Sequence, residues 1–297
     1  MTTSNREAPI GVFDSGVGGL SVLRSMLAQM PDESVVYLAD QGHVPYGSRS
    51  LEQVRDFSEA ITRFLLDKGA KIIVVACNSA SAAALAHLRL TFPDMRFVGM
   101  EPAVKPAAED TATGIVGVLA TPATFQGALF ASVVERFASG VTLLKDTCPG
   151  LVERIEAGDL VGPETHSILR AALEPMLAQG IDTVVLACTH FPFVIPLIQQ
   201  IVGPSVRVID PAPAVARQTE RLLEGGEMLN HDHRSAHIEF YTSGDPRQLE
   251  AMLPALLGRG GEVKALAWVT DRQVIEARAG IVESGSASGR PGKSEHL

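Results

Sequence analysis

The chain has 297 residues, 46% of them hydrophobic, and a formal net charge of −9, so it is long enough for two α/β lobes with their own cores. The acidic balance argues against a nucleic-acid or anionic-membrane surface, and no run of about 18 apolar residues predicts a membrane span. The polar N-terminus lacks the apolar segment of a secretory signal, so we expect a cytoplasmic protein without a nucleic-acid or membrane partner.

The cysteine count excludes a disulfide framework, because three cysteines in a chain of this length are few and odd in number. There is no Cys-x-x-Cys pair, which weakens zinc and dithiol redox interpretations. Cys148 precedes a proline outside any buried run, and we take it as structural.

The first predicted element is a strand at residues 10–13, followed by a glycine-rich turn and a helix at 20–27. This geometry presents backbone N–H groups to an anion. Asp14, at the strand end, can accept from an ammonium or orient a thiol. Alternatively, the segment is a helix cap whose glycines serve only the turn.

A second strand is predicted at residues 35–39, and the loop after it contains Pro45, Tyr46 and Gly47. Glycine and an aromatic hydroxyl at the carboxyl end of a strand suit a ligand carboxylate, although an ordinary turn has the same composition. Amphipathic spacing predicts a helix over 51–68.

Two unbroken apolar runs, 72–75 and 183–186, each lead into Ala-Cys and a polar residue. Such runs predict strands buried on both faces of parallel sheets. Asn78 or Ser79 in the first copy, and Thr189 in the second, are predicted helix caps. Cys77 and Cys188 would then lie at helix N-termini, which lower a thiol pKa; alternatively, each is a small buried hydrophobe.

The second lobe is predicted to begin with a strand at 114–120. Thr121 and Thr124 follow it and either hold a carboxylate or cap a helix. Further strands are expected at 141–144 and 206–210, and a helix at 163–179.

The chain is then predicted to return to the first lobe, with an alternating edge strand at 237–242 and a last strand at 265–269. We expect a first lobe of 8–100 completed by 210–280, a second lobe of 101–209, and a disordered low-complexity tail at 284–297. His231, His233 and His237 are interpreted as a solvated loop, not a metal site.

Together these patterns predict an α/β fold of two pseudo-symmetric open parallel-sheet lobes, with an active site in the cleft between them. Facing lobes would direct Cys77 and Cys188 at one ligand from opposite sides. Two bases on opposite faces of one carbon can invert its configuration by proton transfer. Nothing in the chain resembles a PLP lysine or nicotinamide site, so no cofactor and no metal are expected.

Two other functions are compatible with the patterns. One is nucleotide binding at the glycine turn with Asp40 as the ribose acid, although Ser21 stands where the fingerprint has its third glycine. The other is a non-catalytic two-lobed binding protein.

Six short motifs make the chain resemble the glutamate racemases of the cofactor-independent aspartate/glutamate racemase superfamily. They lie at residues 13–20, 45–47, 76–78, 188–192, 209–211 and 241–245. The resemblance implies an isomerase that interconverts L- and D-glutamate and supplies D-glutamate for peptidoglycan, often as a homodimer. Aspartate racemase of the same superfamily is the nearest alternative.

The resemblance also implies residue roles. Cys77 and Cys188 would be the two bases, Asp14 would assist Cys77, and His190 and Glu156 would assist Cys188. The residues expected around the amino-acid head are Ser15, Asn78, Ser79 and Thr189. Those expected around the distal carboxylate are Pro45, Tyr46, Gly47, Thr121 and Thr124.

Overall fold

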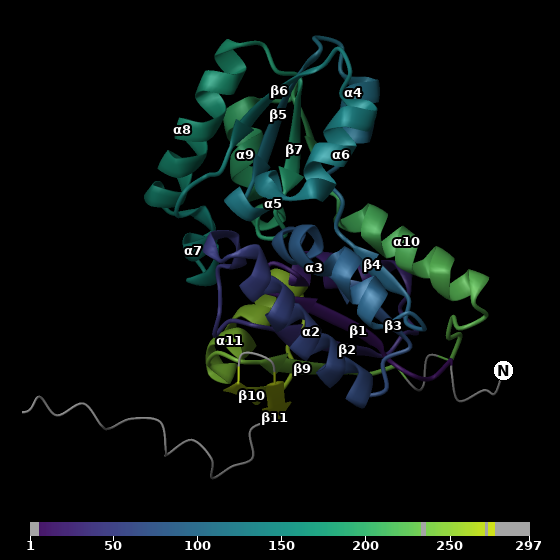
Figure 1. Ribbon diagram of the computed structural model, residues 1–297. Coiled ribbons are helices and arrows are strands. Elements are labelled where there is room, and N and C mark those ends of the chain that lie inside the picture. Colours follow the sequence, from purple (N-terminus) through teal and green to yellow (C-terminus); the bar gives the residue numbers. More distant parts are fainter. Residues whose placement is uncertain (1–5, 233–235, 271–272, 277–297) are drawn as a thin grey trace, which may run out of the picture.

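The computed structural model describes residues 6–232, 236–270 and 273–276, which form two sheets with helices packed on them (Figure 1). The strands of the larger sheet are β1 (Ile10–Asp14), β2 (Val35–Ala39), β3 (Ile72–Val75), β4 (Phe97–Gly99), β9 (Ile238–Thr242), β10 (Val263–Thr270) and β11 (Gln273–Glu276). Those of the smaller sheet are β5 (Ile115–Ala120), β6 (Thr142–Asp146), β7 (Thr183–Ala187) and β8 (Arg207–Ile209).

The same strand order occurs in both sheets. The larger sheet runs β11-β10-β9-β2-β1-β3-β4 and the smaller runs β6-β5-β7-β8. In each, the first strand of the lobe lies between the second and third, and the fourth lies beside the third. The strand pairs are parallel except for β10 with β11. The predicted fold class, two similar parallel-sheet α/β lobes, is confirmed.

Helices connect the strands in both lobes. Those on the larger sheet are α1 (Leu20–Gln29), α2 (Leu51–Asp67), α3 (Asn78–Thr91), α10 (Ala212–Gly225) and α11 (Pro246–Leu257). Those in the chain of the smaller sheet are α4 (Val104–Asp110), α5 (Pro122–Gln126), α6 (Ala128–Phe137), α7 (Leu151–Glu156), α8 (Pro163–Ala178) and α9 (Ile195–Val202). Among the described residues, the short 3₁₀ helices η2 (Tyr46–Ser48) and η3 (Phe191–Val194) follow β2 and β7.

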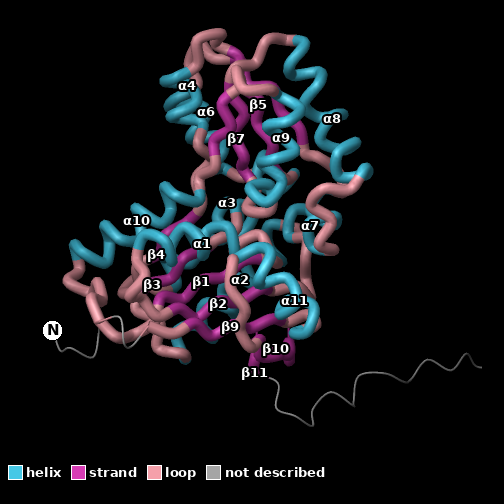
Figure 2. Tube along the Cα trace, turned by 180° about the vertical axis from the view of Figure 1, so that it is seen from behind, coloured by secondary structure: helices cyan, strands magenta, loops and turns pink. Residues whose placement is uncertain are grey.

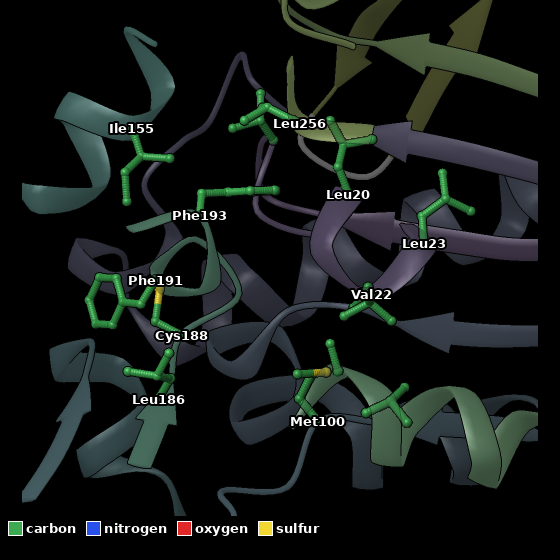
Figure 3. Packing of buried hydrophobic residues seen from close by; sticks show 14 of the residues in the cluster. Leu20, Val22, Leu23, Met100, Ile155, Leu186, Cys188, Phe191, Phe193 and Leu256 are labelled. Atoms are coloured by element: carbon green, nitrogen blue, oxygen red, sulfur yellow. The ribbon is translucent and has the colours of Figure 1, made fainter. Parts of the chain in front are cut away.

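Alternate residues of the larger sheet enter two different cores, because successive strand side chains point to opposite faces. Val12 packs with α1, α10 and α11, whereas Phe13 packs with α2 and α3 (Figures 1 and 2). The first of these cores continues into the second lobe. Leu20 and Leu23 of α1 belong to one cluster with Leu186 and Phe191 (Figure 3). This shared core joins the two lobes beside the ends of β1 and β7.

The C-terminal part differs from the prediction in two respects. β9 is an internal strand, because it pairs in parallel with β2 on one side and β10 on the other. Only the first residues of β9 are partly exposed, because Phe240, Tyr241 and Thr242 are all buried. The strand therefore does not alternate between a buried and an exposed face along its length. β11 then adds an antiparallel edge that the sequence patterns did not indicate.

The membership of the strands supports the domain boundaries that we propose, 8–100 with 210–280 and 101–209. The tail at 284–297, and residues 277–280, lie outside the described residues. Across the described part of the chain, every helix is too short or too polar to cross a membrane.

Candidate active site

The two Ala-Cys repeats end at equivalent points of the two sheets. Cys77 follows β3 and Cys188 follows β7, the third strand of each lobe. Both side chains are buried, and both line a single pocket between the lobes. The carboxyl ends of the parallel strands therefore bring the two thiols together, as the repeat predicts.

The helix caps differ from the prediction. Cys77 is itself the N-cap residue of α3, whose first residue is Asn78, and its side chain makes no capping hydrogen bond. Thr189 is not a cap either, because η3 begins after His190. The side chains of Asn78, Ser79 and Thr189 line the pocket instead.

Cys77 lies beside a buried carboxyl group. Its thiol donates to the Ser15 hydroxyl at 3.8 Å, and Ser15 donates to Asp14 Oδ1 at 3.5 Å. Asp14, at the end of β1, is fully buried, and its Oδ2 accepts from Gly19 N–H at 2.6 Å. Two long contacts and one short one therefore connect the pocket to the first glycine turn.

The surroundings of Cys77 favour its protonated form. Burial, and then the charge of Asp14, raises the pKa of the Cys77 thiol well above its ordinary value. Burial also raises the pKa of Asp14. The prediction that the helix N-terminus lowers the thiol pKa is wrong for Cys77, because desolvation outweighs the helix dipole.

Cys188 lies beside a histidine and a second carboxylate. Its Sγ is 3.8 Å from His190 Nδ1, and His190 Nε2 is 2.6 Å from Glu156 Oε1. The N–H of Val17 donates to the same carboxylate oxygen at 2.7 Å. Glu156 is the last residue of α7, which belongs to the second lobe. The first glycine turn therefore hydrogen-bonds to a residue of the other lobe.

His190 and Glu156 stabilise each other in charged form. Burial alone would raise the pKa of Glu156, but the hydrogen bond and charge of His190 outweigh it and lower that pKa. Burial alone would lower the pKa of His190, but its contacts with Cys188 and Glu156 raise it well above 6.5. In its charged form the ring can donate from both nitrogens, to Glu156 from Nε2 and to the Cys188 sulfur from Nδ1. Cys77 thus lies beside a carboxyl group, whereas Cys188 lies beside a histidine that is paired with a carboxylate.

The predicted binding residues converge on the same pocket, with one exception. Those that line it are Ser15, Pro45, Tyr46, Gly47, Asn78, Ser79, Thr121 and Thr189. Thr124 lies behind Thr121, with their hydroxyl oxygens 3.0 Å apart. Thr121 also caps α5 by accepting from Thr124 N–H, so the helix-cap interpretation holds as well.

The pocket is narrow, and one polar side chain in it lacks a partner. Its cavity volume is about 10 Å³, which is room for about one water molecule. Neither the amide oxygen nor the amide nitrogen of the buried Asn78 has a hydrogen-bond partner among the described residues. A buried amide without hydrogen bonds costs folding free energy. A ligand with both a donor and an acceptor would satisfy the amide of Asn78.

Sequence patterns missed three residues of the site. Val152, on α7, lines the pocket, and Val17 and Gln41 hold Glu156 from the first lobe. Gln41 follows the end of β2, so its position at the carboxyl edge of the sheet was a usable signal. Val17 acts through its backbone N–H, which no side-chain pattern reveals.

The glycine turn has no room for a nucleotide phosphate. A Cβ at Gly16 would lie 1.9 Å from Glu156 Oε1, and one at Gly18 would lie 2.5 Å from His190 Nδ1. Asp40 is fully buried and accepts from Tyr46 and Trp268, so it is not available to a ribose. These contacts argue against the nucleotide-binding alternative.

Comparison with known proteins agrees with this geometry. A family model described as Asp/Glu/Hydantoin racemase matches residues 10–219. The chain belongs to the Asp/Glu/hydantoin racemase family. It is therefore an isomerase, and the racemase activity expected from the motifs is confirmed at this level.

Members of this racemase family with similar sequences and structures are glutamate racemases. The one from Ectopseudomonas mendocina (strain ymp) is 52% identical over 257 residues, which are 86% of this chain and 97% of the relative. A crystal structure of the Escherichia coli enzyme in complex with L-glutamate and the activator UDP-MurNAc-Ala has a TM-score of 0.77 at 33% identity, covering 88% and 98% of the chains. The Francisella tularensis enzyme in complex with D-glutamate has a TM-score of 0.77 at 26% identity, covering 88% and 98%.

Proposed function

We propose that this chain interconverts L- and D-glutamate by proton transfer at Cα between two cysteines, without a cofactor. The observation that carries the proposal is the single pocket lined by Cys77 and Cys188, with Ser15 and Asp14 beside the first thiol and the His190–Glu156 pair beside the second. The glutamate racemases among its relatives support the choice of substrate.

The proposed reaction starts with a Cys188 thiolate beside the His190 imidazolium and with Cys77 as a thiol. The thiolate removes the Cα proton from one face of the substrate, and Cys77 gives its proton to the other face. The product leaves Cys188 protonated and Cys77 as the thiolate, with Asp14 close to it. The reverse reaction runs from that state. By the family resemblance, Cys188 faces the proton of L-glutamate and Cys77 that of D-glutamate.

The polar wall of the pocket suits an amino acid. The unpartnered amide of Asn78 can donate to the α-carboxylate and accept from the ammonium group, with the hydroxyls of Ser15 and Thr189 nearby. For the distal carboxylate we propose Gly47 and the hydroxyl pair of Ser79 and Thr121, whose oxygens are 2.9 Å apart. Donors aimed at the carboxylates stabilise the charge that develops on deprotonation.

In this structure the pocket is too small for this substrate. A cavity of about 10 Å³ does not admit glutamate, so binding requires the pocket to widen. Pro45 and Val152 line both this pocket and a neighbouring cavity of about 280 Å³ that also contacts Glu156. A small separation of the segments bearing these two residues would join the cavities.

Circular dichroism of the purified chain tests the proposal, with L- and D-glutamate and L- and D-aspartate as substrates. After dialysis against a chelator and with no cofactor added, both glutamate enantiomers are expected to reach a racemic mixture. Faster conversion of aspartate than of glutamate would contradict the proposal that glutamate is the substrate. Activity that is lost on dialysis and restored by a metal or by PLP would overturn the two-thiol mechanism. No inversion of any enantiomer would favour a non-catalytic binding protein.

We also propose that the D-glutamate serves peptidoglycan synthesis in a bacterial cytoplasm, and that the enzyme is a homodimer. The relatedness to bacterial glutamate racemases supports these assignments. Depletion of the protein in its own cells should arrest growth unless D-glutamate is supplied, and sedimentation should give the mass of two chains. Growth without the protein or D-glutamate, or a monomer mass, would contradict the corresponding assignment.

A further inference from the structure

Glu156 has two oxygens with different partners. Oε1 is 2.6 Å from His190 Nε2 and accepts from Val17 N–H at 2.7 Å. Oε2 accepts from Gln41 Nε2 at 3.0 Å. His190 and Val17 thus hold one oxygen of the carboxylate, and Gln41 holds the other. The contact with Gln41 limits rotation of the carboxylate about the Cγ–Cδ bond.

A second strand end fixes the amide of Gln41. The hydroxyl of Thr242 accepts from Gly244 N–H at 3.0 Å and donates to Gln41 Oε1 at 2.9 Å. Because Oε1 accepts from Thr242, the NH₂ group faces Glu156, which is the orientation that the carboxylate needs. Thr242 is fully buried and pairs with Ala39 of β2, two residues before Gln41. The support therefore comes from the larger sheet itself.

The contact crosses between the lobes. Gln41 lies just after β2 and Thr242 is the last residue of β9, both in the larger sheet, whereas Glu156 and His190 belong to the segment that forms the smaller sheet. Each oxygen of the Glu156 carboxylate therefore has a donor from the first lobe. Gln41 is a side-chain donor from the first lobe, as Val17 is a backbone donor.

We infer that Gln41 is a positioning residue for the Cys188 side of the site, where it orients Glu156 so that Glu156 holds His190 against the sulfur. Its catalytic consequence rests on the proposed two-thiol reaction, but its effect on His190 does not. Without the amide, Glu156 Oε2 would lose its donor, the carboxylate would be easier to protonate, and His190 would lose part of its anionic partner.

Gln41→Met tests the inference, because methionine keeps the length of the side chain and removes the amide. Gln248→Met is the matched control: Gln248 Nε2 donates to the backbone oxygen of Glu156 at 3.2 Å and not to its carboxylate. Thr242→Val is a second variant, which keeps the amide of Gln41 and removes the group that fixes its orientation.

The first readout is the NMR titration of His190 in the unliganded protein, with the signal assigned by its loss in His190→Gln. The groups that act on this ring are Glu156, Cys188 and Asp14, and none of them is changed. Gln41→Met should move the titration to lower pH by about half a unit or more, and Thr242→Val should move it by less in the same direction. Gln248→Met should leave it unchanged. Equal titrations in Gln41→Met and Gln248→Met would overturn the inference.

The second readout is racemisation. Gln41→Met should lower kcat about tenfold with KM within about twofold, and should shift the acidic limb of the kcat profile to higher pH. An unchanged kcat and pH profile would overturn the catalytic part of the inference. If the unmodified protein fails to racemise glutamate, the proposed function fails, and the His190 titration still decides the role of Gln41. If Gln41→Met does not fold, the titration of Thr242→Val decides it.

Discussion

The Tyr46 hydroxyl donates to Asp40 Oδ2 at 2.6 Å. Tyr46 lines the pocket between the lobes, whereas Asp40 lies just after β2 and also accepts from Trp268 Nε1 at 2.8 Å. One hydrogen bond therefore connects a wall of the pocket to the larger sheet and, through the indole, to β10. A change at this contact should affect ligand binding more than chemistry.

Tyr46→Phe should raise the KM for glutamate about fivefold and change kcat less, because the loop loses its attachment while both thiols keep their neighbours. The cost in stability should be about 1–2 kcal/mol, since the buried Asp40 loses one donor. Steady-state kinetics and denaturant unfolding measure the two effects. The matched control is Tyr241→Phe, whose hydroxyl donates to Glu239 at 2.7 Å outside the pocket. An equal rise in KM in both variants would contradict a local role for Tyr46.

Cys77→Ala and Cys188→Ala should each abolish inversion, because the carbanion formed on one face can no longer be protonated from the other. Each variant should still exchange the Cα proton of one enantiomer in heavy water. By the proposed assignment, Cys188→Ala labels D-glutamate and Cys77→Ala labels L-glutamate. The NMR signal of the Cα proton measures this, and Cys148→Ala, which keeps both proposed bases, is the control. Labelling of both enantiomers by one variant would mean that one residue serves both faces.

Glu156→Gln should lower stability most between pH 4.5 and 6.5. The pKa of Glu156 is lowered in the folded protein, so its contribution is fully present above 4.5 and is lost as the pH falls through the folded value. The pKa of His190 is raised, so its contribution is fully present below 6.5 and is lost as the pH rises through the folded value. Breaking this buried pair should cost about 3 kcal/mol within that window.

Denaturant unfolding of the unmodified chain and of Glu156→Gln across the pH range checks this prediction. Glu59→Gln is the control, because Glu59 pairs with His87 at 2.7 Å in a partly exposed contact. The control should lose less than about 1 kcal/mol. A loss in Glu156→Gln that does not vary with pH would show that the pair is not ionised.

Gly16→Ala should reduce kcat by about tenfold or more and should destabilise the fold by up to about 3 kcal/mol, because it displaces one partner of the buried His190–Glu156 pair. The added methyl group would lie 1.9 Å from Glu156 Oε1, the oxygen that His190 and Val17 hold. The carboxylate must move away, so His190 loses its partner. Gly225→Ala is the control, because Gly225 ends α10 and a Cβ there would meet no described residue within 4 Å apart from its own helix and chain neighbours. This variant should be more stable than the unmodified protein by about 0.5 kcal/mol or more. Full activity in Gly16→Ala would show that Glu156 tolerates displacement.

The sequence predicted the elements whose signals are local. Runs such as 72–75 and 183–186 are apolar without alternation because both faces of each sheet are covered, so strands β3 and β7 and the positions of their cysteines followed directly. The edge assignment of 237–242 failed because pairing with β2 depends on residues about 200 positions away, which no local pattern encodes. The pKa of Cys77 was misjudged for a similar reason, since burial is a property of the assembled pocket.

The pairing of β9 with β2 also bears on how the protein is made. The smaller sheet is built from residues 115–209 and emerges from the ribosome as one continuous segment, before β9 exists. Until Ile238 is available to pair with Val35, β2 remains an open edge, and such edges promote association with other chains. Thr242 and Ser243, which hold Gln41 and Asp40, arrive at the same late stage. Nascent chains stalled before residue 238 should therefore contain a folded smaller sheet but no ordered site.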